Sequence, residues 1–580
     1  MTPLQTLLRY FLPHRARLAL GVVCVLAGNL FKAGGPILLQ HAIDALTGEI
    51  TNSVLLRYAG LLVLVALIQG VFLFSQQRLF IGMALAIEYD LRNDFYRHLQ
   101  KLPLEFFKAN STGDLMARAT NDIATIRTVV GWVIMAMVNT ILAIAIIMPL
   151  VARLSWEFAL LSFLPMLLMA ASTKFFGKRI CDRFEEVQES LGKVSSRAHE
   201  SLSGVRAIRA YNHEQSEVQA FRRINRQYFR HNVRLIRLSA ILYPFLRFFI
   251  AFGFMALLWH GGNLAIGGKI TIGQFVQLAV YLEYLIWPFC QLGSIIDFFE
   301  RGVASMRRVH SIMSVAPAIA DAPQPVNLGE IVGQIEFRDL TFKYDGAARP
   351  VLRGINLLVR PGQTVALVGA VGSGKSTLLN LVPRLLDAEP GQVLIDGLPI
   401  GQVPLDLLRS SIGYVTQECF LFSESITANI AFGMQEASQR EVEIAAAEAG
   451  IAEDIAEFPA GYETIIGERG ITLSGGQKQR TTIARAIIRR PRILILDDAF
   501  SSVDTYTEEK ILEHLRNLMR GRTCLITSHR ISTVKDADLI VVLDEGRIAE
   551  QGTHDELVAY GGLYAELYEK QLLGEELAAS

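Results

Sequence analysis

The sequence predicts a chain of two folded parts, an α-helical membrane domain with six spans followed by an α/β domain with a largely parallel sheet. In the N-terminal half, six apolar stretches have about the 20-residue length that crosses a bilayer. Beyond residue 334, short β-branched runs alternate with helical patterns, which is typical of an α/β fold. A length of 580 residues also exceeds what one hydrophobic core usually holds. We therefore expect a membrane domain at 1–315, a linker at 316–333 and a second domain at 334–575.

Composition supports the membrane assignment and excludes two other classes of protein. Hydrophobic residues make up 51% of the chain and the mean hydropathy is +0.33, above the range of an ordinary soluble enzyme. Basic and acidic residues both number 56, so no basic excess points to nucleic acid as a partner. The five cysteines are scattered without paired or metal-ligand spacing, which argues against a zinc site and against a disulfide framework.

The spans predict a multi-pass topology with long cytoplasmic connections. The two connections 78–127 and 178–237 are polar and rich in Lys and Arg, so the positive-inside tendency places them and both chain ends in the cytoplasm. The first apolar run continues past Gly35 without a small-residue cleavage site, which predicts a retained span and not a removed signal. We place the six spans at 17–42, 55–77, 128–152, 157–177, 238–261 and 273–298.

The two long connections carry helical apolar spacing and few breakers, so they are expected to continue the membrane helices into the cytoplasm. Solvated helical hairpins and levers that contact another domain are both compatible with this pattern. Arg247 and Glu283 lie within predicted spans, where an unpaired charge is costly. We expect both to face the protein interior, and the two could face each other; snorkelling of Arg247 to the membrane surface is the alternative.

The stretch GAVGSGKST, from Gly369 to Thr377, fits the pattern G-x-x-x-x-G-K-[ST] and lies between a predicted strand and a predicted helix. Glycines let backbone N–H groups turn inward around phosphate oxygens, and Lys375 and Ser376 supply a cation and a metal-binding hydroxyl. The residues expected to bind a nucleotide here are Gly369, Gly372, Ser373, Gly374, Lys375, Ser376 and Thr377.

A second nucleotide motif follows at ILILDD, where an apolar strand ends in two acids. The strand places Asp497 to reach Mg²⁺, and the next residue, Asp498, is expected to orient the attacking water. The segment LIVVLDEG also ends a strand with an acid, Asp544. Because a Gly turn follows it, we interpret Asp544 as an ordinary strand exit.

The stretch LSGGQ, Leu473 to Gln477, precedes a predicted helix, and with the two motifs above it resembles the signature of the ATP-binding cassette (ABC) family. Together with the six spans, the whole chain resembles a half-transporter of the exporter type, with the fold named type I or type IV. The resemblance implies ATP and Mg²⁺ as cofactors. It also implies that Ser474, Gly475, Gly476 and Gln477 bind the ATP held by a second chain.

Other family positions carry over onto single residues. Tyr344 resembles the aromatic residue that stacks on adenine, and an edge-strand tyrosine is the alternative. Gln417 resembles the glutamine that contacts Mg²⁺ and the attacking water, and His529 the histidine that contacts the γ-phosphate. The segments SSVD (501–504) and GERG (467–470) resemble the D-loop and an exporter-specific segment.

The family implies that two cassettes close head to tail, so that this chain holds half of each ATP site and needs a second half-transporter as partner. The turns at 106–114 and 210–217 resemble the coupling helices of exporters, with Tyr211 as an anchor on the opposite cassette. In the family pattern, a glutamate follows the aspartate that ends this strand, which is called the Walker B aspartate. Here that position is Asp498, whose side chain is one methylene shorter than glutamate. The resemblance therefore predicts slow ATP hydrolysis at this chain's own P-loop together with an intact signature, a combination typical of one subunit of a heterodimer. A homodimer that hydrolyses ATP slowly is the alternative.

These features predict ATP-driven export or flipping of an amphipathic drug, lipid or peptide across a bacterial inner membrane. A non-transporting ATPase would lack the six fused spans, and an importer would keep permease and cassette on separate chains. An ATP-gated channel or regulatory subunit stays open as an alternative. The aromatic-rich spans around 241–261 and 281–289 suit amphipathic substrates, and equally suit packing between helices or against lipid. The substrate itself is not predicted.

Overall fold

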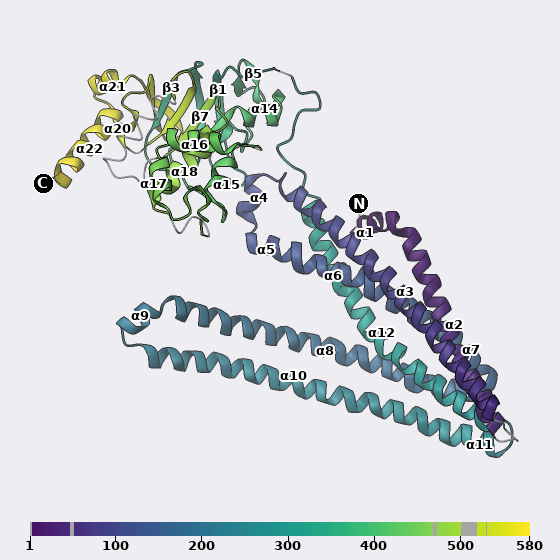
Figure 1. Cartoon of the computed structure of the whole chain (residues 1–580). Helices are drawn as coiled ribbons and strands as arrows, with labels where there is room; N and C mark the ends of the chain where they lie inside the picture. The colour runs from purple at the N-terminus through teal and green to yellow at the C-terminus, as the bar shows by residue number, and fades with distance from the viewer. Residues whose placement is uncertain are drawn as a thin grey trace. The chain divides into compact units, whose positions relative to one another are not determined.

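The computed structural model describes residues 3–46, 52–326, 328–434, 436–467, 473–499, 519–528 and 530–579. The chain forms two compact units. One comprises 1–100 and 110–316, and the other comprises 101–109 and 317–580. The first unit is helical, and the second holds all the described strands (Figure 1).

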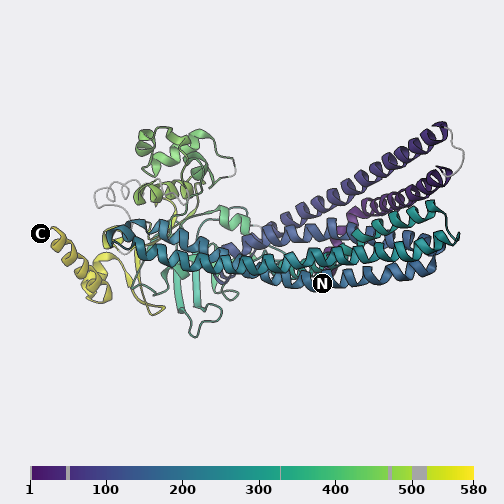
Figure 2. The same cartoon turned by 90° about the horizontal axis from the view of Figure 1, so that it is seen from below.

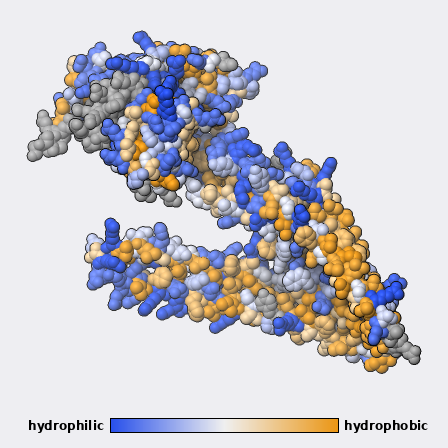
Figure 3. Space-filling model, in the orientation of Figure 1, coloured by the Kyte–Doolittle hydropathy of each residue, from blue (hydrophilic) through white to orange (hydrophobic). Residues whose placement is uncertain are grey.

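The first unit contains six helices long and apolar enough to cross a membrane, as the sequence predicts. They run over Gln5–Leu46, Asn52–Leu99, Thr112–Leu154, Trp156–Ser203, Glu214–Ile266 and Ile272–Met313. Lengths of 42 to 53 residues exceed the roughly 20 that a bilayer needs, so the helices extend beyond it as expected for the long connections. Hydrophobic side chains gather toward the end with α11, and hydrophilic ones are denser around α9 (Figure 3).

Within this unit, α8 and α10 run side by side and are joined by the short α9, whereas α2, α3, α7 and α12 form a second group (Figures 1 and 2). Three π-helical turns, at 118–122, 129–133 and 257–261, connect helical segments without breaking them. The helices of the unit are α1 (Pro3–Phe11), α2 (Arg15–Leu46), α3 (Asn52–Leu99), α5 (Thr112–Ala117), α6 (Ile123–Thr128), α7 (Ile134–Leu154), α8 (Trp156–Ser203), α9 (Val205–Ala210), α10 (Glu214–Ala256), α11 (Gly262–Ile266) and α12 (Ile272–Met313).

Polar side chains on the membrane helices find partners on neighbouring helices. Asn29 of α2 donates to Asn139 of α7 at 2.9 Å, and the Tyr281 hydroxyl of α12 donates to the Ala33 carbonyl of α2 at 2.9 Å. Where water is absent, such bonds hold helices together because the alternative is an unsatisfied group. Neither the expected interior position nor the suggested pairing of Arg247 and Glu283 is found within this chain. Both described residues are exposed on the chain's own surface, and no ion pair joins them.

The two long helical connections contain turns at the predicted places. Between α9 and α10 the chain reverses through Asn212, whose φ of +52° is left-handed, and the preceding Tyr211 is 77% exposed. The other predicted turn, 106–114, covers the end of α4 (Leu104–Ala109) and the start of α5. Tyr211 is therefore available for contact with another molecule, as an anchor residue requires.

The second unit contains a six-stranded sheet in the order β10-β9-β3-β8-β7-β6 and a four-stranded sheet in the order β2-β1-β4-β5. The larger sheet is parallel except for the β9–β10 hairpin, which confirms the predicted parallel α/β fold; the antiparallel sheet is an addition to it. The strands are β1 (Ile335–Phe342), β2 (Leu352–Val359), β3 (Thr364–Val368), β4 (Val393–Ile395), β5 (Leu398–Pro399), β6 (Ile412–Val415), β7 (Ile493–Asp497), β8 (Thr523–Thr527), β9 (Leu539–Asp544) and β10 (Arg547–Gly552).

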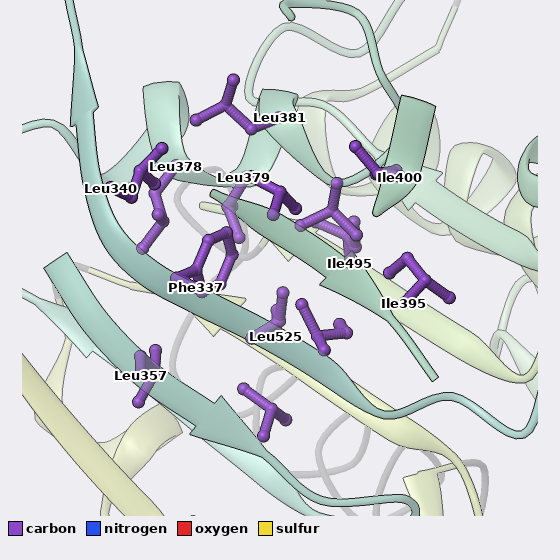
Figure 4. Close-up of a cluster of buried hydrophobic side chains, with 14 of the residues drawn as sticks. Phe337, Leu340, Leu357, Leu378, Leu379, Leu381, Ile395, Ile400, Ile495 and Leu525 are labelled. Atoms are coloured by element: carbon purple, nitrogen blue, oxygen red, sulfur yellow. The ribbon is translucent and has the colours of Figure 1, made fainter. Parts of the chain in front are cut away.

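The two largest hydrophobic clusters among the described residues of this unit pack against its sheets. The first lies between the sheets and α13 and includes Phe337, Leu379 and Ile495, all at most 2% exposed (Figure 4). The second joins β7 to the helices around α18. Besides α4, the unit's described helices are α13 (Lys375–Leu381), α14 (Leu405–Ser410), α15 (Ile426–Ala431), α16 (Gln439–Glu448), α17 (Ala452–Glu457), α18 (Gly475–Ile487), α20 (Ile531–Val534), α21 (His554–Tyr560) and α22 (Leu563–Ala579).

Candidate nucleotide site

The loop between β3 and α13 can form only with glycine at three positions. Gly369, Gly372 and Gly374 have φ values of +147°, +85° and +104°, a region that side chains rarely adopt. A Cβ at Gly374 would also lie 2.7 Å from a methyl group of Leu352. Ser373 in the same loop is 4% exposed, and its hydroxyl has no hydrogen-bond partner among the described residues. A buried hydroxyl of this kind fits a ligand oxygen, such as one of a phosphate.

Lys375 opens α13 and turns its side chain back over the loop. Its Nζ donates to the carbonyl oxygens of Gly369 at 2.8 Å and Ala370 at 2.9 Å, and the residue is 8% exposed. Burial lowers the pKa of Lys375 below its ordinary value, and the carboxylates of Asp497 and Asp498 counteract part of this shift. Both oxygens that hold the ammonium are neutral, so an anionic ligand would interact with it more strongly.

Asp497 ends β7, a strand whose five residues are all buried. Its Oδ1 accepts hydrogen bonds from the Ser376 hydroxyl at 3.1 Å and the Thr527 hydroxyl at 2.6 Å. The bond to Thr527 follows from sheet register, because β7 and β8 are parallel neighbours that pair Asp497 with Thr527. Hydroxyl and carboxylate oxygens are thereby gathered at one edge of the sheet, and these are the ligands that Mg²⁺ prefers.

Asp498 follows directly and has a different backbone. Its φ is +48°, a left-handed conformation that costs a non-glycine residue about 1–3 kcal/mol. The Asp498 N–H donates to the Thr527 carbonyl at 3.1 Å and to the Thr527 hydroxyl at 2.9 Å, which holds the turn in place. The two consecutive acids therefore have separate environments, one within the strand and one in the turn after it.

These residues surround one cleft with a volume of about 230 Å³. Eight of the residues predicted for the site line it, which means that the fold brings the loop, the strand end and the Gln417 segment together. They are Gly372, Gly374, Lys375, Ser376, Thr377, Gln417, Asp497 and Asp498. Gly369 and Ser373 belong to the same loop without being among the lining residues. Gln417 lies exposed, two residues beyond the end of β6.

Tyr344 lies beside the cleft without lining it. Its ring packs edge-to-face on Phe342 with 5.1 Å between the ring centroids, and its hydroxyl lies 3.1 Å from the Thr377 hydroxyl. The side chain is half-buried. Both expectations for this residue, a base-stacking ring and an edge-strand tyrosine, are compatible with a ring anchored next to the phosphate loop.

The signature residues form a separate surface of the same unit. Ser474 caps α18, and none of Ser474, Gly475, Gly476 and Gln477 is among the described residues that line the cleft. Ser474 and Gly475 are exposed. The P-loop and the signature of this chain thus do not line the same cleft. This separation agrees with the family resemblance, which implies that the signature serves the ATP held by a second chain.

Several predicted segments lie outside the described residues. His529 is one of them, and the others are 468–470 of GERG and all of SSVD, 501–504. Asp544, the competing acid, ends β9 exposed and leads through Glu545 and Gly546, both with positive φ, into the antiparallel β10. It does not line the cleft, in agreement with its interpretation as a strand exit.

Sequence reasoning missed Thr527, which contacts both acids, as well as Ser528, Val351 and Val371 of the cleft lining. A signal for Thr527 was present, because it ends the strand TCLIT and parallel neighbours end at the same sheet edge. Val351 lies between Tyr344 and Gly369 in the sequence, and no local pattern indicates that it lines the cleft.

Comparison with known proteins gives consistent matches over both parts of the chain. The family described as "ABC transporter transmembrane region" matches residues 18–289, and the family described as "ABC transporter" matches residues 352–501. The chain is 38% identical over 567 residues to the probable multidrug resistance ABC transporter ATP-binding/permease protein YheI of Bacillus subtilis (strain 168), covering 97% of each chain. It is 36% identical over 578 residues to the ATP-dependent lipid A-core flippase of Syntrophus aciditrophicus (strain SB), covering 99% of this chain and 96% of the relative.

A solved structure is similar over the same extent. It is described as a bacterial Atm1-family ABC exporter with ATP bound, and it aligns with a TM-score of 0.79 at 30% sequence identity. The alignment covers 96% of this chain and 98% of the other. The likeness therefore includes the membrane helices and the cassette together.

Proposed function

The chain belongs to the ABC transporter family as an ATP-hydrolysing, multi-pass membrane transporter of the exporter type, and from this premise we propose that it is one half of a dimeric exporter. The substrate is an amphipathic drug, lipid or peptide, and the location is the bacterial inner membrane. Relatives named for multidrug resistance and for lipid A-core flipping support this substrate class.

One observation carries the need for a second chain. The cleft contains the P-loop lysine and the two strand-end acids, whereas Ser474 and Gly475 of the signature are exposed and do not line the cleft. In our proposal, Gly369, Gly372, Ser373, Gly374, Lys375, Ser376 and Thr377 hold the phosphates of ATP and Tyr344 stacks on its adenine. The residues from Ser474 to Gln477 then complete the ATP site of the partner chain.

We assign Ser376, Gln417 and Asp497 to Mg²⁺. The Ser376 and Asp497 oxygens are 3.1 Å apart, which suits two ligands of one small ion that takes its remaining ligands from phosphate and water. Bound there, Mg²⁺ would neutralise phosphate charge during hydrolysis. Asp498, His529 and Gln417 are proposed to position the attacking water and the γ-phosphate.

Asp498 underlies the proposal of a heterodimer. Its carboxylate is one methylene shorter than a glutamate at this position, so it reaches about 1 Å less far toward a water, and such a displacement can cost on the order of 10²-fold in rate. A partner that carries the glutamate would then do most of the hydrolysis with the aid of this chain's intact signature. The second candidate is a homodimeric lipid or multidrug exporter, which is favoured by the presence of both half-sites on one chain.

The test of the exporter function is transport. The chain, co-purified with its partner and reconstituted in inverted vesicles, should accumulate fluorescent amphiphiles against a gradient when ATP and Mg²⁺ are supplied. The Lys375→Ala variant should abolish accumulation while still reaching the membrane. Flux that only dissipates a gradient would indicate a channel and contradict the proposal.

The test of the heterodimer compares two changes in the same complex. Asp498→Ala in this chain should lower ATPase activity mildly, and a Glu→Gln change at the partner's equivalent position should nearly abolish it. If the chain alone hydrolyses ATP rapidly and Asp498→Ala silences it, the homodimer is correct.

A further inference from the structure

The signature segment is held in place by an acid from a different helix. Asp454 belongs to α17, and its Oδ1 accepts hydrogen bonds from Gln477 Nε2 at 3.0 Å and Arg480 Nη2 at 3.2 Å. Its Oδ2 lies 2.8 Å from Arg480 Nη1 in an ion pair whose side chains are 23% and 14% exposed. Both carboxylate oxygens therefore contact the first turns of α18.

The bond to Gln477 fixes which way its amide points. A glutamine amide has one accepting oxygen and one donating NH₂ group, and an ionised carboxylate can only accept. With Nε2 donating to Asp454, Oε1 faces the Ser474 N–H and accepts from it at 3.0 Å. A reversed amide would place NH₂ against that N–H and an oxygen against the carboxylate, so two favourable contacts would become repulsive.

This orientation leaves the Ser474 hydroxyl free to act outward. Ser474 Oγ accepts from the Gln477 N–H at 3.3 Å, which closes a capping box at the start of the 13-residue helix α18. The hydroxyl proton has no acceptor in the part of the chain that the structure describes, and the residue is exposed. Ser474 can thus donate to an anion brought up from outside the chain.

Arg480 also links α17 to the signature segment. Besides Asp454, it donates to the Gly450 carbonyl at 2.7 Å and to the Gly476 carbonyl at 3.5 Å. Gly450 forms the left-handed turn that leads to α17, with a φ of +69°. The turn, α17 and the signature are therefore joined by side chains, so the signature cannot shift without moving its neighbours.

We propose that Asp454 is a positioning residue for ATP hydrolysis, which acts through Gln477 to hold Ser474 and the first turn of α18 toward ATP bound by the partner's P-loop. This inference rests on the proposed function, in which the signature serves the partner's site. Asp454 itself contacts no nucleotide. Its role is to hold the Ser474 hydroxyl and the first turn of α18 in position before the two cassettes close. A displacement of these donors by about 1 Å would lower the rate of hydrolysis.

The experiment uses the full chain with its partner, reconstituted in lipid, and compares Asp454→Ala with Glu453→Ala. Glu453 is the preceding, exposed residue of α17, and its side chain makes no hydrogen bond or ion pair within the described residues, so it is a matched control. We expect Asp454→Ala to lower kcat for ATP about tenfold or more, in the range that positional errors produce. The KM for ATP, photolabelling of this chain's own P-loop by azido-ATP and the Tm should stay near the values of the Glu453→Ala variant.

Two further variants separate positioning from a general structural role. Asp454→Asn retains an accepting oxygen for Gln477 Nε2, so it should recover most of the lost kcat. The double variant Asp454→Ala with Gln477→Ala should be no slower than the slower single variant, because residues that act in one chain of contacts are not additive.

Four results would overturn the proposal: a kcat equal to that of Glu453→Ala, equal loss for Asn and Ala, multiplicative loss in the double variant, or parallel loss of kcat, photolabelling and Tm. A different result would show that the proposed function itself is wrong. Ser474→Arg, which alters the signature itself, would then leave the ATPase activity of the complex intact, whatever Asp454 does.

Discussion

The cassette presents two surfaces that we propose bind nucleotide, the cleft and the signature, and they differ in how each is stabilised. In the cleft, Lys375, Ser376 and Asp497 are at most partly exposed and are hydrogen-bonded to groups of the same sheet edge. At the signature, Ser474 is exposed, and its support comes from Asp454 on another helix. The cleft is thus arranged by the strand order itself, while the signature depends on side-chain contacts within the helical part. We expect changes at the cleft to affect nucleotide binding and changes at the signature to affect turnover.

The largest expected effect removes the cleft's cation. Lys375→Ala should raise the Kd for ATP at this chain's own site at least about thirtyfold, as expected for loss of one partner in a buried charge pair. Photolabelling with azido-ATP measures this, and Lys535→Ala, which removes an exposed lysine of the same unit, is the control. Undiminished labelling of the Lys375 variant would refute the assignment.

A bulky signature variant should separate turnover from binding. Ser474→Arg places a long cation where the partner's ATP is expected and removes the helix cap, so kcat should fall at least about tenfold, the scale of losing one such donor. Labelling of this chain's own P-loop should persist. Ser438→Arg is the matched control, because Ser438 caps α16 with the same capping box. Equal inhibition by both variants would mean that the loss of a cap, and not the signature, explains the effect.

Extending one side chain in the cleft tests its reach. Asp498→Glu adds the missing methylene, and turnover at this chain's site should rise, by about tenfold if the shortfall is near 1 Å. Single-turnover hydrolysis by a complex whose partner site is inactive measures this directly. Unchanged or slower hydrolysis by the glutamate variant would indicate that the length of Asp498 does not limit the rate.

The smallest effect is expected beside the cleft. Tyr344→Phe removes the 3.1 Å hydroxyl contact with Thr377 and keeps the ring, so ATP affinity should change less than about fivefold, the value of one ordinary hydrogen bond. Tyr344→Ala should weaken binding more, because it removes the ring. If both variants bind ATP equally well, Tyr344 does not stack on the base.

Much of the fold was predictable because its signals are local. Six apolar stretches of bilayer-crossing length predict six membrane helices. The strands β3, β7, β8 and β9 each coincide with a continuous run rich in β-branched and other apolar residues. Four strands, β2, β5, β6 and β10, had no such run. In β2, Gly354 with a φ of +62° interrupts the strand pattern, and β6 is four residues long. The antiparallel sheet was therefore missed, since its existence depends on pairing between β1 and partners far along the chain.

The sequence by itself determined that this chain has a membrane domain and the motifs that we propose form both halves of an ATP site, because the P-loop, the strand-end acids and the signature are each short, contiguous motifs. Only the tertiary structure decided which residues support them. Thr527 reaches Asp497 across 30 residues through the register of β7 and β8, and Asp454 reaches Gln477 across 23 residues through helix packing. The physical reason is that a hydrogen bond requires two atoms within about 3 Å. Sequence spacing fixes such a distance within one turn or strand, and only packing fixes it between elements.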